Sequence, residues 1–191
     1  MRYIILFVIL VSCHSPSRIP SAAVTIIPRA QWGALEAKPY RQHDPVRITV
    51  HHEGTQLLPT DDAARKINRI QAWGMGPDRN WADIPYHFLI APNGKVYEGR
   101  AVTTVGETNT EYDPAGHLLI CCLGNYEVQE VPEALLRSLI QMIAMASRTY
   151  NIPLTTLATH RDHSTQTSCP GKNLYAYFTS GYVLQEAKKL K

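Results

Sequence analysis

The chain contains little charge and almost no charge imbalance. Only 18% of its 191 residues are charged, and 19 basic against 16 acidic side chains leave a formal net charge of +3. A charge-rich disordered tail is excluded, because 45% of the residues are hydrophobic. The small excess does not argue for a nucleic-acid partner either, since no basic run interleaved with aromatic residues is present. Composition therefore indicates a globular protein.

Long hydrophobic runs are also scarce. Residues 3–11 (YIILFVILV) are apolar, but this run is too short for a membrane-spanning helix, which needs about 20 residues. After the positive charge of Arg2, the run is typical of a signal peptide. It ends in Leu10-Val11-Ser12-Cys13, which resembles the bacterial lipobox, where the cysteine becomes lipidated after cleavage. An ordinary secretory signal with an incidental cysteine is the alternative.

We therefore predict a lipoprotein-type signal peptide over residues 1–12 and lipidation of Cys13. The protein would be exported and anchored to a lipid membrane of the cell envelope, facing the periplasm in a Gram-negative cell. Residues 13–27 begin with a Ser- and Pro-rich stretch without helical periodicity, and we expect them to form a lipid-anchored tether. The remaining residues, 28–191, suit one domain, which we expect to be monomeric.

Cysteine is sparse, and its positions do not suggest a disulfide framework. If Cys13 carries lipid, an odd number remains, namely Cys121, Cys122 and Cys169. Cys121 and Cys122 are adjacent in an apolar run, where successive strand side chains point to opposite faces, so they are poorly placed to bridge one another. Cys169 needs another explanation.

Beyond residue 28 the hydrophobic periodicity mixes strands with helices, which indicates an α/β or α+β domain. Strands are predicted over 46–51, 86–91, 95–100 and 117–124, and the Asn-Gly pair at 93–94 predicts a hairpin. One amphipathic helix is predicted to begin after Thr60 as its N-cap and to continue to about residue 72. A second is predicted from Pro132 to about residue 146.

Two of the eight histidines lie where sites are usually built. His51 ends a predicted strand, and His160 enters a polar turn. Cys169 follows nine residues after His160, so a returning loop could bring both side chains to one ion. Two imidazoles and one thiolate leave the fourth tetrahedral position open, as in a catalytic zinc site. On spacing alone, buried or surface histidines beside a free thiol explain the pattern as well.

Five motifs occur in order between residue 28 and about residue 178. They are Arg29-Ala30-Gln31-Trp32-Gly33-Ala34, Val50-His51-His52, Asp83-Ile84-Pro85-Tyr86-His87-Phe88, Gly94-Lys95-Val96-Tyr97-Glu98-Gly99-Arg100, and His160-Arg161 through Cys169-Pro170-Gly171. Together they resemble the N-acetylmuramoyl-L-alanine amidase family, which includes peptidoglycan recognition proteins and amidase-type phage lysozymes. The resemblance implies an α/β fold with a mixed central sheet flanked by α-helices, a Zn²⁺ ion in a surface cleft, and peptidoglycan or muropeptides as partners. It also implies hydrolysis of the amide between N-acetylmuramic acid and L-alanine.

The resemblance also implies residue roles. They are zinc ligation by His51, His160 and Cys169, and catalysis by Tyr86 and Thr167. His52 is adjacent to the first ligand, but on a strand the two imidazoles point to opposite faces, and the resemblance selects His51. Trp81 and Arg100 are expected to bind substrate, the former by stacking on sugar rings. Ala101-Val102 replaces the residue pair by which recognition proteins distinguish stem-peptide types, so the stem type is unreadable.

Three positions depart from the family pattern. Glu53 stands where relatives commonly carry Ser or Thr, and its carboxylate could accept a proton near the metal or point to solvent. Cys121 falls where some relatives have an acid that assists catalysis, although a buried thiol more simply reports packing. Glu107 stands where His is common in the family.

Two other functions stay open at this stage. One is a module that binds peptidoglycan without cutting it, and the other is a zinc amidase that acts on a different amide. In the family, loss of the cysteine ligand is the usual mark of a binding module. The presence of Cys169 therefore favours catalysis.

Overall fold

The structure is a computed structural model that describes residues 23–190. The predicted signal peptide, Cys13 and most of the predicted tether lie outside these residues. Within the described range, no helix combines the length and apolarity that crossing a bilayer requires.

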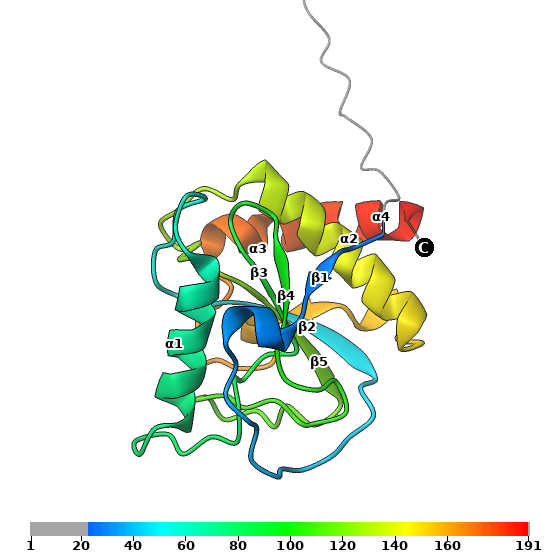
Figure 1. The fold of residues 1–191 in the computed structure, drawn as a ribbon. Coiled ribbons are helices and arrows are strands. Elements are labelled where there is room, and N and C mark those ends of the chain that lie inside the picture. The colour runs from blue at the N-terminus through cyan, green and yellow to red at the C-terminus, as the bar shows by residue number, and fades with distance from the viewer. Residues whose placement is uncertain (1–22, 191) are drawn as a thin grey trace, which may run out of the picture.

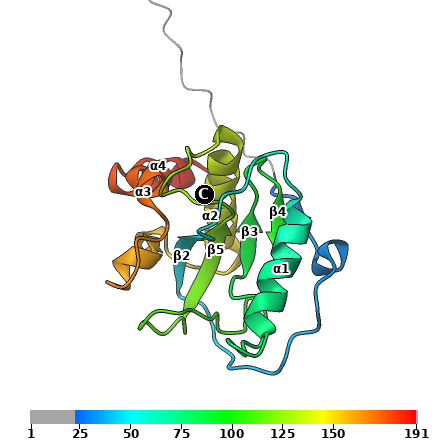
Figure 2. The same ribbon diagram turned by 90° about the vertical axis from the view of Figure 1, so that its left-hand side faces the viewer.

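A six-stranded mixed sheet forms the centre of the fold, in the order β1-β4-β3-β5-β2-β6. Its strands are β1 (Ile26–Ile27), β2 (Arg47–His52), β3 (Phe88–Ile90), β4 (Val96–Glu98), β5 (His117–Cys122) and β6 (Ala158–Thr159). β3 and β4 pair antiparallel, whereas the other neighbours pair in parallel. Figure 2 shows β2, β5, β3 and β4 side by side. The predicted hairpin is confirmed, and Gly94 provides its left-handed turn with φ +85°.

The sheet begins earlier in the chain than predicted. Ile26 pairs with Val96 and Ile27 with Tyr97, so the end of the predicted tether is part of the fold, and the expected domain start at residue 28 is too late. A strand of two residues is too short to show a period-2 pattern, and only its pairing with β4 defines it.

Helices cover both faces of the sheet. They are α1 (Ala63–Met75), α2 (Glu133–Thr149), α3 (Lys172–Thr179) and α4 (Tyr182–Lys189). In Figure 1, α1 lies on one side of the sheet and α2 on the other. The N-cap of α1 is Asp62, whose carboxylate accepts a hydrogen bond from the Arg65 backbone N–H; the predicted cap, Thr60, lies two residues too early. The start of α2 after Pro132 agrees with the prediction.

The strand β5 separates two hydrophobic cores. All six of its residues are buried. Cys122 belongs to the core under α2, α3 and α4, and Cys121 to the core under α1, which confirms that the adjacent thiols face opposite ways. Because β2, β5 and β6 are parallel, their carboxyl ends meet at one edge of the sheet, where ligand sites of α/β folds are commonly found.

Candidate metal centre and cleft

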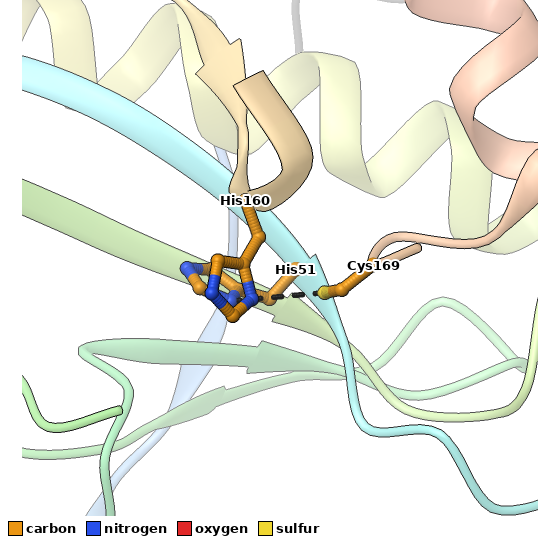
Figure 3. Close-up of side chains that lie close together, drawn as sticks. All are labelled: His51, His160 and Cys169. Carbon is orange, nitrogen blue, oxygen red and sulfur yellow. Dashed lines mark hydrogen bonds between the residues drawn. The ribbon is translucent and has the colours of Figure 1, made fainter. Parts of the chain in front are cut away.

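Two histidines and one cysteine meet at this edge of the sheet. His51 comes from β2, His160 from the first position of the 3₁₀ turn η3 (His160–Asp162), and Cys169 from the following loop. Their ligand atoms all lie within 4.8 Å of one another, and all three residues are buried. Figure 3 shows the side chains converging, with His51 Nδ1 3.8 Å from Cys169 Sγ. The structure thus brings together the three residues that were predicted to ligate zinc.

Local hydrogen bonds explain this convergence. Val50 of β2 pairs with Thr159 of β6, so the next residue of each strand emerges at the same place. The Asp162 carboxylate accepts bonds from the backbone N–H and the hydroxyl of Thr159, both at 2.7 Å, and thereby closes the turn that carries His160. The Arg161 N–H donates to the Cys169 carbonyl at 2.9 Å, which draws the cysteine loop back to this turn.

His52 does not belong to the metal cluster. Its backbone N–H donates to Cys169 Sγ at 3.2 Å, and its Nδ1 accepts a bond from the Tyr126 N–H at 3.2 Å. The pleat of β2 directs the two adjacent imidazoles apart. His52 therefore contributes a main-chain hydrogen bond that favours a thiolate at Cys169.

The protonation states of the cluster suit a divalent metal. Burial holds the pKa of His51 well below 6.5, with a further contribution from the nearby His160. Burial lowers the pKa of His160 to about 4, so both imidazoles are neutral at pH 7. Burial raises the pKa of the Cys169 thiol to about 12, and a divalent cation would stabilise its thiolate form instead. Two neutral imidazoles and one thiolate fit tetrahedral zinc with one open position.

The cluster opens into a pocket of about 230 Å³. Three other predicted site residues, Tyr86, Thr167 and Trp81, also line it. The Tyr86 ring lies 5.3 Å from the His51 ring, and burial holds the pKa of the Tyr86 hydroxyl well above 10. The hydroxyl is therefore protonated at neutral pH and can donate a hydrogen bond. The Thr167 hydroxyl accepts a bond from the Cys169 N–H at 3.0 Å.

A second pocket of about 460 Å³ adjoins the first and shares Tyr86, Trp81 and Glu53 with it. The helix α1 adds Lys66, Arg69 and Trp73 to its lining. Trp73 is half exposed, and its ring meets Trp81 edge-on at 5.4 Å. The two pockets together form a cleft that runs from the metal cluster to the side chains of Lys66, Arg69, Trp73 and Trp81.

Glu53 does not point to solvent, so that interpretation is wrong. Its carboxylate is ion-paired with Lys66 at 3.0 Å, and its side chain is only 13% exposed. It also accepts a bond from the Thr55 backbone N–H at 3.1 Å. Because Glu53 lines both pockets, this ion pair lies where they join.

The structure does not bring Arg100 to the cleft. Arg100 is 1% exposed, and its guanidinium donates to the backbone carbonyls of Ile84 at 2.6 Å and Asp83 at 3.0 Å. It also forms an ion pair with the buried carboxylate of Glu107, which in turn accepts bonds from the Ala82 N–H at 3.0 and 3.1 Å. Arg100 and Glu107 thus hold the chain after β4 against the segment that precedes β3.

Sequence reasoning missed two residues that touch the predicted ligands. Thr110 Oγ1 lies 2.8 Å from His160 Nε2, and the Tyr112 hydroxyl lies 3.3 Å from His51 Nε2. Both residues occur in a polar segment before β5 without a recognisable motif. The only sequence signal is their i, i+2 spacing, which lets both side chains face one way in an extended segment.

The chain is similar to known proteins over most of its length. The family model described as N-acetylmuramoyl-L-alanine amidase matches residues 41–172. Peptidoglycan recognition protein 1 of Bos taurus is 34% identical over 156 residues, which cover 79% of this chain and 80% of that protein.

Two solved structures share the fold. The N-acetylmuramoyl-L-alanine amidase LysC from Clostridium intestinale is similar with a TM-score of 0.64 and 27% identity, over 83% of this chain and 99% of that one. Peptidoglycan recognition protein LE in complex with tracheal cytotoxin, a monomeric diaminopimelic acid-type peptidoglycan, is similar with a TM-score of 0.69 and 28% identity, over 81% of this chain and 92% of that one. The chain therefore belongs to the N-acetylmuramoyl-L-alanine amidase family, whose members include peptidoglycan recognition proteins.

Proposed function

We propose that this protein is a zinc-dependent N-acetylmuramoyl-L-alanine amidase, which hydrolyses the amide bond between N-acetylmuramic acid and L-alanine in peptidoglycan. The observation that carries the proposal is the set of three buried donors, His51, His160 and Cys169, at the floor of a pocket that Tyr86 also lines. Similarity to the Clostridium amidase over nearly the whole of its length supports it.

The donor set would hold zinc and leave one coordination position open toward the pocket. When bound, zinc lowers the pKa of a water molecule from about 16 toward 7 and polarises the amide carbonyl. The Tyr86 hydroxyl, which stays protonated because it is buried, donates a hydrogen bond to the oxyanion that develops on the carbonyl oxygen. The Thr167 hydroxyl offers a second, uncharged donor on the same pocket wall.

The second pocket suits the rest of a glycopeptide. Arg69 supplies positive charge for a substrate carboxylate, whereas the charge of Lys66 is paired with Glu53. Trp73 and Trp81 present indole rings on which sugar faces can stack. A substrate that is part sugar and part anionic peptide matches this lining better than an apolar amide does.

The test is mass spectrometry of the products released from purified peptidoglycan by the zinc-loaded protein and by its Cys169→Ala variant. We expect stem peptides that begin with L-alanine, with intact glycan strands, from the wild type and none from the variant. Cys122→Ala is the matched control, because this buried cysteine faces the opposite core and its loss leaves the donor set complete.

Two results would contradict the proposal. Polymer that retains the protein but stays uncut would favour a peptidoglycan-binding module, the role suggested by the name of the bovine relative. A different cleavage product would indicate a zinc amidase on another amide.

A further inference from the structure

The segment 108–113 contacts both histidines of the metal cluster, and its first residues also line the metal pocket. Thr110 Oγ1 is 2.8 Å from His160 Nε2, and the Tyr112 hydroxyl is 3.3 Å from His51 Nε2. The Tyr112 ring also packs against the ring of His160 at 5.1 Å between centroids. One short segment therefore contacts the outer nitrogen of each imidazole.

This segment is itself held in place. Glu111, between the two hydroxyl residues, accepts bonds from the Ser164 hydroxyl at 2.6 Å and from the Thr165 N–H at 3.0 Å. The segment is thereby tied to the loop that runs from His160 to Cys169. On its other side the Tyr112 ring packs against His117 at 5.2 Å. The two hydroxyls are thus fixed relative to the ligands.

The hydrogen-bond geometry distinguishes the two nitrogens of each ring. The Thr110 Oγ1 lies 3.0 Å from the hydroxyl oxygen of Thr108, to which it can donate its own proton, so its lone pairs are free to accept from His160. His51 presents its Nδ1 to Cys169 Sγ at 3.8 Å and its Nε2 to Tyr112. A histidine that binds a metal through one nitrogen almost always hydrogen-bonds through the other, which fixes its tautomer and ring orientation.

We propose that Thr110 and Tyr112 are positioning residues that accept the Nε2–H of His160 and His51 and so hold both imidazoles with Nδ1 toward the metal. This inference rests on the metal site of the proposed function. Thr110 lines the metal pocket, but neither residue needs to touch the substrate for this effect, because each acts through the histidine that it contacts.

The test is the dissociation constant for Zn²⁺, measured on the full chain by competition with a chromophoric chelator. Thr110→Val removes the hydroxyl and keeps the shape of the side chain, and Tyr112→Phe removes only the phenolic oxygen. We expect each to weaken zinc binding about 10- to 100-fold, the usual effect of losing such a partner. Thr110→Ser, which keeps the hydroxyl, should bind zinc with an affinity within a few-fold of wild type.

Matched controls separate positioning from general damage. Thr155→Val removes an exposed hydroxyl and Tyr182→Phe a phenol far along the chain, in α4, and both should leave zinc affinity unchanged. Circular dichroism of the metal-free variants checks that they fold. Substitution with Co²⁺ adds a second readout, since its visible absorption reports the ligand geometry, and we expect altered bands in Thr110→Val and wild-type bands in Thr110→Ser.

The outcomes separate this inference from the proposed function. If wild type binds zinc and folded Thr110→Val and Tyr112→Phe bind it equally well, the positioning role is overturned and the metal site stands. If Thr110→Ser is as weak as Thr110→Val, the hydroxyl is not the cause, which also overturns the role of Thr110. If the wild type binds no zinc, both proposals fall together.

Discussion

Tyr86 illustrates how burial can define the role of a single side chain. Its side chain lines the metal pocket, and desolvation raises the pKa of its hydroxyl well above the ordinary value of 10, with additional contributions from the nearby Cys121 and Cys169. A phenol in this state is a hydrogen-bond donor and not a base at neutral pH. Its proposed task is to stabilise the oxyanion.

We therefore predict that Tyr86→Phe retains zinc but lowers kcat for stem-peptide release by about 10²- to 10³-fold, the effect of losing one oxyanion-hole donor. Zinc content by elemental analysis and steady-state rates on peptidoglycan check both parts. Undiminished activity in a zinc-loaded Tyr86→Phe protein would remove the tyrosine from the mechanism. Tyr182→Phe is the control, because its hydroxyl lies in α4, outside the lining of the cleft.

In the connection between β4 and β5, burial likewise defines the role of side chains, here at the scale of an element. The chain leaves β4 through Arg100, whose guanidinium is buried against three backbone carbonyls and the carboxylate of Glu107. These bonds anchor the base of the segment that continues to Thr110 and Tyr112. The motif that contains Arg100 was recognisable in the sequence. Arg100 was expected to bind substrate, but in the structure it is buried outside the lining of the cleft.

We predict that Arg100→Met destabilises the fold by about 3–5 kcal/mol, because it leaves a buried carboxylate at Glu107 without its partner. Urea unfolding of the metal-free protein measures this free energy. The double variant Arg100→Met/Glu107→Gln should recover part of the loss, since it removes the uncompensated charge. Wild-type stability together with weakened muropeptide binding would instead support the original assignment of Arg100 to the substrate.

At the scale of the whole molecule, histidine burial makes stability depend on pH. All seven histidines of the described residues have a pKa below 6.5, with burial as the leading cause. His87 is fully enclosed: its Nδ1 accepts from the Leu119 N–H at 2.8 Å, its Nε2 lies 2.9 Å from the Thr104 carbonyl, and its pKa is lowered to about 3.

The sign of the effect follows from proton linkage. The unfolded chain binds protons on histidine below about pH 6.5, while the folded chain resists them down to about pH 3 at His87 and about pH 4 at His160. The contribution of the neutral, buried histidines to stability is therefore fully present above about pH 6.5 and is lost as the pH falls through this window. At pH 5, His87 alone should lower the free energy of unfolding by on the order of 2 kcal/mol relative to neutral pH.

We predict that the urea midpoint of the chelator-treated protein falls steadily between pH 7.5 and pH 5. His163→Gln, which replaces a partly exposed histidine, should retain most of this dependence. A midpoint that stays constant over the same range would contradict the prediction.

The proposed lipid anchor also belongs to this scale. We propose that Cys13 is lipidated and retains the domain at a membrane. In bacterial expression, Cys13→Ala should shift the protein from the membrane to the soluble fraction after cell lysis. Mass spectrometry of the N-terminal peptide should show a lipid mass that the variant lacks, whereas an unmodified cysteine in the wild type would argue for an ordinary secretory signal.

Much of the architecture was readable from local pattern. The Asn-Gly hairpin, the apolar strand at residues 117–122, the two long helices and the opposite orientation of Cys121 and Cys122 all follow from short-range periodicity and turn chemistry. The motifs of the family were sufficient to single out His51, His160 and Cys169 as a set, which the structure brings within 4.8 Å. These features depend on residue type and spacing along the chain.

Contacts between distant segments depended on tertiary structure alone. The strand at Ile26–Ile27 exists because it pairs with β4, and Glu53 faces Lys66 because folding brings the residue after β2 beside a side chain of α1. Arg100 turns inward because its donors satisfy carbonyls that packing has buried. Thr110 and Tyr112 reach the histidines because the segment that carries them is tied to the loop after β6. Because Thr110 and Tyr112 belong to no periodic pattern or motif, their contacts with the histidines become visible only in the folded chain.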